Sequence, residues 1–261
     1  MAPELAPDLP PDLPPDLPRF AVAQFVARRG DIDANVGRHV PLAERAAQAG
    51  AHLVLFPELA LTGYEPDLAA QLALMPDDAR LAPLRDAAVR HHLTIVTGAP
   101  LRAPGHPAIA ALSFLPDGGV DVYTKQYLHP GEEKAFRAGT GGAPLAVEGT
   151  QVALAVCAEI AHARHAAAAA QAGAGLYAAS VLVSEGGYAA DAALLQGYAR
   201  THRMPVAMAN HGGPTGDWAS AGRSAVWDEK GEIVVAAAGA GECLLLAART
   251  AGAWHGGLID G

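Results

Sequence analysis

Three side chains that could take part in catalysis each stand at the end of an expected strand. Glu58 follows HLVLFP, Lys125 follows VDVYT and Cys157 follows QVALAV. Short apolar runs of this kind predict buried strands, and the carboxyl ends of strands are where α/β folds place reacting groups. Together the three residues offer a thiol nucleophile, a carboxylate base and a cation for a developing oxyanion. The set predicts an acyl-transfer site with a cysteine nucleophile.

Each of the three also has a structural explanation when it is taken singly. A cysteine after an apolar strand is commonly a small buried hydrophobe, a glutamate can cap a turn, and a lysine can mark where a strand reaches solvent. Histidine is the usual base, but none of the 11 histidines lies in a sequence context typical of cysteine hydrolases. A carboxylate is therefore the competing assignment for the base.

The composition argues against several classes of function. The 18 basic and 27 acidic residues give a formal charge of −9, and the cations are scattered, which disfavours binding to nucleic acid or to an anionic membrane. Gly, Pro or charge interrupts every apolar stretch that approaches the length of a spanning helix. Two cysteines cannot form a disulfide framework and no secretory pattern is seen, so we expect a cytoplasmic protein.

The periodicity of the chain predicts an α/β fold. Residues 1–18 repeat a Pro-Asp-Leu-Pro unit and are expected to form an extended, disordered tail, followed by a single domain over 19–261. Turn chemistry at Pro-Asp-Gly-Gly (116–119) favours an antiparallel hairpin, so the sheets should be mixed. Two mixed sheets packed together, with helices outside, fit this order of elements. The expected strands are 20–27, 52–56, 93–98, 108–115, 120–125, 151–156, 176–183, 206–210, 224–227, 232–237 and 242–247, and the expected helices are 33–48, 77–92, 161–172 and 189–203.

Three segments in order resemble the signatures of a known superfamily. FPELALTGY (56–64), YTKQYLHPGEEKAF (123–136) and VALAVCAEI (152–160) are similar to those of the nitrilase, or carbon-nitrogen hydrolase, superfamily. NHGGPTGDWASAGRSAVWD (210–228) resembles the late glycine-rich turn and strand of its amidase-like branch. The resemblance implies a four-layer αββα sandwich, in which two mixed sheets pack face to face with helices outside.

The same resemblance implies a Glu-Lys-Cys triad made of Glu58, Lys125 and Cys157. Glu58 would be the base, Cys157 would form a thioester, and Lys125 with the backbone N–H of Ala158 would hold the oxyanion. The implied reaction is hydrolysis of a small-molecule amide or N-carbamoyl compound, without a metal or other cofactor. A nitrilase or an acyltransferase would use the same triad, and a non-catalytic metabolite-binding relative is a further alternative. The resemblance also implies a homodimer or higher homo-oligomer.

Family members carry a second glutamate in the loop after the lysine, and this chain offers two. We expect Glu133, eight residues past Lys125, to hold the lysine and the substrate, with Glu132 as the alternative. Glu159 stands where many relatives have aspartate and is expected to fix the turn after Cys157. His129 departs from the family pattern, so it either lines the pocket or is an exposed loop residue.

Further candidates for the substrate pocket are Tyr64, Val181, Ser184 and Asn210, although each could equally be a packing or turn residue. Cys243 lies within an expected strand, which predicts an inert core position. His162 and His165 are spaced for one face of a helix, but the sequence offers them no matching third ligand, so we expect no metal site.

Overall fold

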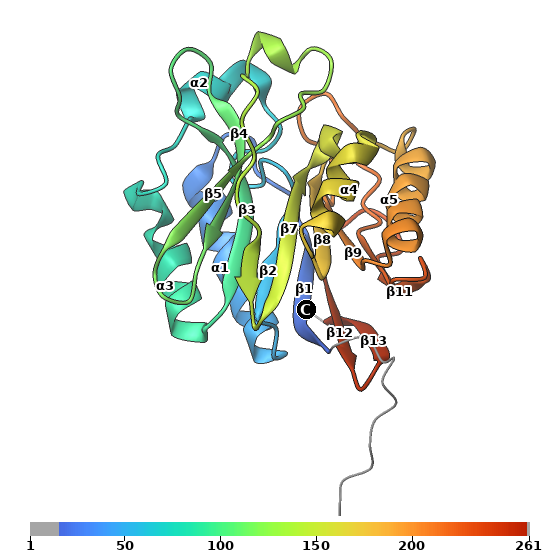
Figure 1. Cartoon of the computed structure of the whole chain (residues 1–261). Helices are drawn as coiled ribbons and strands as arrows, with labels where there is room; N and C mark the ends of the chain where they lie inside the picture. The colour runs from blue at the N-terminus through green and yellow to red at the C-terminus, as the bar shows by residue number, and fades with distance from the viewer. Residues whose placement is uncertain (1–15, 260–261) are drawn as a thin grey trace, which may run out of the picture.

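Two β-sheets pack face to face at the centre of the computed structural model, which describes residues 16–259 (Figure 1). The seven-stranded sheet contains β1 (Leu17–Gln24), β2 (Leu53–Leu55), β3 (Thr94–Leu101), β4 (Ala108–Phe114), β5 (Val120–Thr124), β12 (Cys243–Thr250) and β13 (Ala253–Ile259), in the order β13-β12-β1-β2-β3-β4-β5. The six-stranded sheet contains β6 (Leu145–Val147), β7 (Thr150–Val156), β8 (Leu176–Val181), β9 (Val206–Asn210), β10 (Ala225–Trp227) and β11 (Ile233–Ala236), in the order β11-β10-β9-β8-β7-β6. Both sheets mix parallel and antiparallel pairs, as expected.

Helices cover the outer face of each sheet and complete the four-layer αββα sandwich (Figure 1). On the seven-stranded sheet lie α1 (Ile32–Gln48) and α3 (Ala82–His91), and on the six-stranded sheet lie α4 (Ala163–Gln171) and α5 (Tyr188–His202). The short helix α2 (Ala69–Leu72) and four 3₁₀ turns, Pro66–Leu68, Ala79–Leu81, Glu132–Lys134 and Cys157–Ala161, lie in the connections. The fold class that the sequence predicts is therefore confirmed.

Helix α1 shows how local sequence sets an element. The Asp31 side chain accepts a hydrogen bond from the N–H of Ala34 at 3.1 Å and caps the first turn. Val36 and Ala43 lie on the buried face, whereas Pro41 lies on the exposed side inside the helix. The helix therefore continues through the proline.

The expected boundary between tail and domain is wrong by two residues. β1 begins at Leu17, whose apolar side chain is buried and which pairs with Arg249 of β12. The register shifts between Leu17 and Phe20, and this irregularity accommodates Pro18, which has no N–H for the ladder. Residues 1–15 of the expected tail lie outside the part of the chain that the structure describes.

Within residues 16–259, no helix has the length and apolar character needed to cross a membrane. The structure describes a single chain, so the expected oligomeric state stays a prediction. The expected cellular compartment also stays a prediction.

A close backbone approach fixes the turn that carries Glu58. A Cβ atom added to Gly98, in β3, would lie 2.1 Å from the backbone nitrogen of Leu59. Leu59 itself has a φ of 50°, a left-handed conformation that most residues avoid. The absence of a side chain at Gly98 therefore lets the turn after β2 lie against the neighbouring strand.

We expect Gly98→Ala to destabilise the fold and displace Glu58. Relief of the clash requires a backbone shift, so the free energy of unfolding should fall by about 2 kcal/mol or more in urea denaturation. Gly37→Ala is the matched control, because the exposed Gly37 in α1 has open space around its Cβ position and alanine favours helices. Equal unfolding free energies for the two variants would contradict this account of the turn.

Candidate active site

The Lys125 ammonium lies between two buried carboxylates. Its Nζ donates hydrogen bonds to Glu58 Oε1 at 2.7 Å and to Glu132 Oε1 at 2.8 Å. The side chains of Lys125 and Glu58 are fully buried and that of Glu132 is 2% exposed. Burial opposes the charged form of Lys125, but the neighbouring carboxylates outweigh it and raise the pKa of the ammonium above its usual value. Lys125 is therefore a permanent cation.

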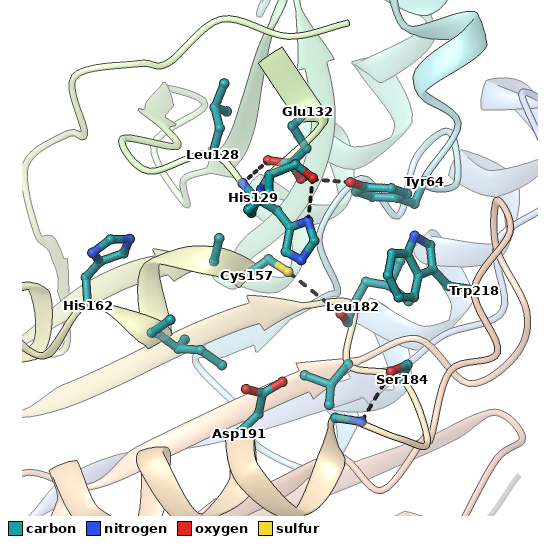
Figure 2. A pocket seen from close by; sticks show the side chains of 16 residues that line it. Tyr64, Leu128, His129, Glu132, Cys157, His162, Leu182, Ser184, Asp191 and Trp218 are labelled. Atoms are coloured by element: carbon teal, nitrogen blue, oxygen red, sulfur yellow. Dashed lines mark hydrogen bonds between the residues drawn. The ribbon is translucent and has the colours of Figure 1, made fainter. Parts of the chain in front are cut away.

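The second glutamate at the lysine is Glu132, so the expectation for Glu133 is wrong. Besides Lys125, Glu132 accepts hydrogen bonds from the Tyr64 hydroxyl at 2.9 Å and from the N–H of His129 at 2.7 Å (Figure 2). Glu133 is exposed, and its carboxylate accepts a hydrogen bond from the N–H of Gly131 instead. Adjacent residues of the 3₁₀ turn Glu132–Lys134 point in different directions, so only one of the two can face the lysine.

Cys157 stands at the junction of β7 and the 3₁₀ turn Cys157–Ala161. Its φ is 44°, an uncommon conformation for a residue other than glycine, and its Sγ lies 3.7 Å from the carbonyl oxygen of Leu182. Burial raises the pKa of the thiol, the charge of Glu58 raises it further, and Lys125 acts in the opposite direction. The thiol is thus protonated at rest and needs a base before it can attack.

Glu58 has a free oxygen that can accept this proton. Its Oε2 is buried and has no hydrogen-bond partner among the residues that the structure describes, whereas Oε1 bonds to Lys125. Burial raises the pKa of the Glu58 carboxyl, Lys125 lowers it and the charge of Glu132 raises it. A carboxyl with a raised pKa is better matched to general acid-base work near neutral pH than an ordinary glutamate.

Two hydrogen bonds from the six-stranded sheet hold the segment that carries Glu58. The Ser180 hydroxyl, on β8, donates to the carbonyl oxygen of Phe56 at 2.8 Å. The Nε2 of the buried His211, after β9, lies 2.7 Å from the carbonyl oxygen of Glu58, and burial lowers the pKa of this histidine to about 4. A neutral imidazole facing a carbonyl must donate its hydrogen, so His211 positions the backbone of Glu58. Sequence reasoning missed this role, because only the fold brings His211 to Glu58.

Glu159 was expected to fix the turn after Cys157. Its carboxylate bonds to the backbone next to that turn and also to the backbone after Lys125. Its carboxylate accepts hydrogen bonds from the N–H of Val156 and of Gln126, both at 2.7 Å, and from the Tyr123 hydroxyl at 2.9 Å. Burial raises the pKa of Glu159 to about 7. Its contacts run through the backbone on both sides of the site, which is a positioning role.

A cavity of about 370 Å³ opens beside the Cys157 thiol (Figure 2). Of the residues expected at the pocket, Tyr64, His129, Glu132, Ala158 and Ser184 line it. His129 fits both of its alternatives, because it is exposed and also lines the cavity. The other residues that line the cavity beside Cys157 are Leu128, Pro130, Ile160, Ala161, His162, Leu182, Val183, Gly187, Asp191 and Trp218.

Two expected pocket residues lie elsewhere. The Val181 side chain is buried between the six-stranded sheet and its helices, and the next two residues line the cavity in its place. Asn210 is buried and bonds to the backbone of Val183 and Gly222, so it holds the loop rather than the substrate. Cys243 is half-buried in β12 and does not line the cavity. Within residues 16–259, no group of three or more His, Cys, Asp or Glu side chains is placed to hold a metal ion.

The model of one family, described as carbon-nitrogen hydrolase, matches residues 19–254. The chain belongs to the carbon-nitrogen hydrolase family. The family membership and the amidase structures below identify the protein as an enzyme that acts on carbon-nitrogen bonds.

Solved structures of an amidase of the nitrilase superfamily from Nesterenkonia sp. AN1 resemble this hydrolase over most of both chains. A mutant of that amidase showing Michael addition of acrylamide at its active-site cysteine is 30% identical, with a TM-score of 0.80, and the match covers 88% of this chain and 92% of that chain. A mutant in complex with butyramide is also 30% identical, with a TM-score of 0.80, covering 90% and 92%.

Among curated proteins, a glutamine-dependent NAD(+) synthetase from Xylella fastidiosa is 33% identical over 153 residues. The match covers 54% of this hydrolase and 27% of that relative. The matched segment therefore spans about a quarter of the length of the synthetase.

The position of Glu132 predicts a pH effect that Glu133 cannot have. If Glu58 is the proton acceptor for Cys157, as expected from the sequence, the rate of alkylation of Cys157 by iodoacetamide should fall as pH drops through the pKa of Glu58. In Glu132→Gln, one of the contributions that raise this pKa is lost. The acid side of the profile of alkylation rate against pH should then move to lower pH by up to about one unit. Glu133→Gln, the matched control, should leave the profile in place. A shift in the Glu133 variant alone would contradict the assignment.

Proposed function

We propose that this hydrolase cleaves the carbon-nitrogen bond of a small amide or N-carbamoyl compound through a Cys157 thioester. The observation that carries the proposal is the placement of Lys125, bonded to two buried carboxylates, beneath a cavity that exposes the Cys157 thiol. The resemblance to an amidase that has been solved with butyramide bound and with acrylamide added to its active-site cysteine supports a small carboxamide as the substrate class. A cavity of about 370 Å³ is at the small end of ligand pockets.

In the first half-reaction Glu58 Oε2 takes the thiol proton while Cys157 Sγ attacks the carbonyl carbon of the amide. The carbonyl oxygen becomes an oxyanion. An ammonium group has three donors, and two of those on Lys125 bond to Glu58 and Glu132. The third is free for the oxyanion. The N–H of Ala158 supplies a second donor, because the first N–H groups of a helical turn have no acceptor within the turn.

Collapse of the tetrahedral intermediate breaks the carbon-nitrogen bond. The proton held by Glu58 passes to the leaving nitrogen, which departs as ammonia or an amine and leaves the acyl group on Cys157. In the second half-reaction Glu58 takes a proton from water, the hydroxide attacks the thioester, and the proton returns to the departing thiolate. Glu58 can serve in both half-reactions because it begins and ends each of them as an ionised carboxylate.

The deciding experiment assays ammonia release and intact mass with a panel of short amides. The wild type should release ammonia and show a transient acyl adduct on the peptide that contains Cys157. Cys157→Ala should lose at least about a thousandfold in kcat, since the covalent path is gone. Cys243→Ala, which changes the other cysteine outside the cavity, should keep activity and adduct.

Other outcomes separate the competing functions. Ammonia from nitriles but from no amide would assign the nitrilase reaction, and transfer to hydroxylamine without hydrolysis would assign an acyltransferase. A thiol at Cys157 that is no more reactive than that of Cys243, with no turnover, would assign a non-catalytic binder. L-glutamine belongs in the panel, because the synthetase relative is named as glutamine-dependent.

A further inference from the structure

The cavity contains a carboxylate that the hydrolytic reaction does not use. Asp191, in the first turn of α5, lines the cavity and projects from the helix toward the space beside Cys157 (Figure 2). It is half-buried, and among the residues that the structure describes its carboxylate has no hydrogen-bond or ion-pair partner. Burial raises the pKa of Asp191 and the nearby His129 lowers it. A cation bound in the cavity would restore the interactions that this carboxylate loses with water.

Trp218 adds a second group that favours a cation. It lines the same cavity and is 41% exposed, so part of its indole surface is open to a ligand. A tight turn holds it, in which Thr215 and Trp218 exchange backbone hydrogen bonds, and the Thr215 hydroxyl accepts from the N–H of Tyr64. Indole rings attract ammonium groups through their π-surface.

The rest of the lining offers little to an anion. No lysine or arginine lines the cavity among residues 16–259, and Lys125 lies behind it with two of its donors bonded to carboxylates. The basic groups of the lining are the imidazoles of His129 and His162. Asp217, next to Trp218, is exposed, and the whole chain carries a charge of −9. The field at the entrance thus favours positively charged substrates.

We propose that Asp191 is a specificity-determining residue that binds a protonated amine at the non-reacting end of the substrate. The preferred substrates are then small amides or N-carbamoyl compounds that carry a cation and lack a carboxylate. This inference rests on the proposed function, since the amide carbon must reach Cys157 while the ammonium group reaches Asp191. Trp218 forms the wall against which the cationic end packs.

The test compares kcat/KM at about pH 8 for three amides of matched length: 5-aminopentanamide, hexanamide and 5-carboxypentanamide. The wild type should prefer the aminoalkyl amide over the neutral one by about tenfold or more, mainly through KM, and should use the carboxylate least. Asp191→Asn should bring the ratio of cationic to neutral amide close to one. Asp191→Lys should reverse the order of the cationic and anionic amides.

The matched control is Glu185→Gln. It removes the same charge six residues before Asp191, but Glu185 is exposed, ion-pairs with Arg223 and does not line the cavity. The ratio between cationic and neutral amides should therefore stay at the wild-type value in this variant. If the ratio falls equally in the Glu185 and Asp191 variants, the preference for the cationic amide comes from the net charge of the protein, and the proposal is overturned.

Two further outcomes separate this inference from the proposed function. Turnover of neutral amides without preference for the cationic one overturns the role of Asp191 and leaves the hydrolase function intact. If no amide is turned over, calorimetry on Cys157→Ala protein decides, because binding needs no reaction. The cation subsite is supported if Cys157→Ala protein binds the aminoalkyl amide and the added change Asp191→Asn abolishes this binding. Equal binding of all three amides to Cys157→Ala protein overturns it.

Discussion

One buried ammonium group, that of Lys125, determines how the site is built. It faces the carboxylates of Glu58 and Glu132, so one positive charge balances two potential negative charges out of contact with solvent. Buried charges are tolerated only when they are paired and hydrogen-bonded, because the loss of hydration is large. The Tyr64 hydroxyl and the N–H of His129 supply the remaining hydrogen bonds to Glu132. Burial raises the pKa of the Glu58 carboxyl, and the charge of Glu132 adds to this rise while Lys125 opposes it.

The packing of the two sheets brings the nucleophile to this charged group. Glu58 and Lys125 follow strands of the seven-stranded sheet, whereas Cys157 follows a strand of the six-stranded sheet. Neither sheet holds the full set, so the site exists only where the two layers meet. The hydrogen bonds from Ser180 and His211 to the segment around Glu58 cross between the layers. Thus the scaffold fixes the base relative to the thiol through backbone carbonyls, independently of the charge on the reacting groups.

The sequence predicted the parts of the site that follow regular elements. Lys125 and Cys157 stand directly after strands and Glu58 stands three residues after one, and strand ends can be read from periodicity. The loop after β5 has no periodicity, so the sequence could not tell Glu132 from Glu133, and their opposite directions appear only in the folded 3₁₀ turn. A similar shift of one position separated Val181 from Leu182, because neighbouring residues at a strand end face opposite sides of the sheet.

Much of the fold was predicted for the same reason, and the omissions have physical causes. The expected strands and long helices are present, but β13 was missed because its sequence, AWHGGLI, contains two glycines and little alternation. β6 is only three residues long, too short for a periodic signal. Asp191 and Trp218 carry no local pattern that would mark them as cavity residues. The two residues reach the same cavity only in the folded chain, one from a helix and the other from a loop.

The electrostatics of the resting site make the reaction depend on the substrate. Ionisation of Cys157 before the substrate arrives would add a third negative charge near one cation, which is why burial and Glu58 together raise the pKa of the thiol. In the proposed reaction, attack on an amide carbon moves the new charge from sulfur to the carbonyl oxygen, for which Lys125 and the N–H of Ala158 are the proposed donors. Proton transfer to Glu58 neutralises one carboxylate at the same moment, so the number of negative charges around Lys125 stays constant. Under the proposed mechanism, the site therefore rests as a neutral thiol and becomes nucleophilic only when an electrophile can take up the charge.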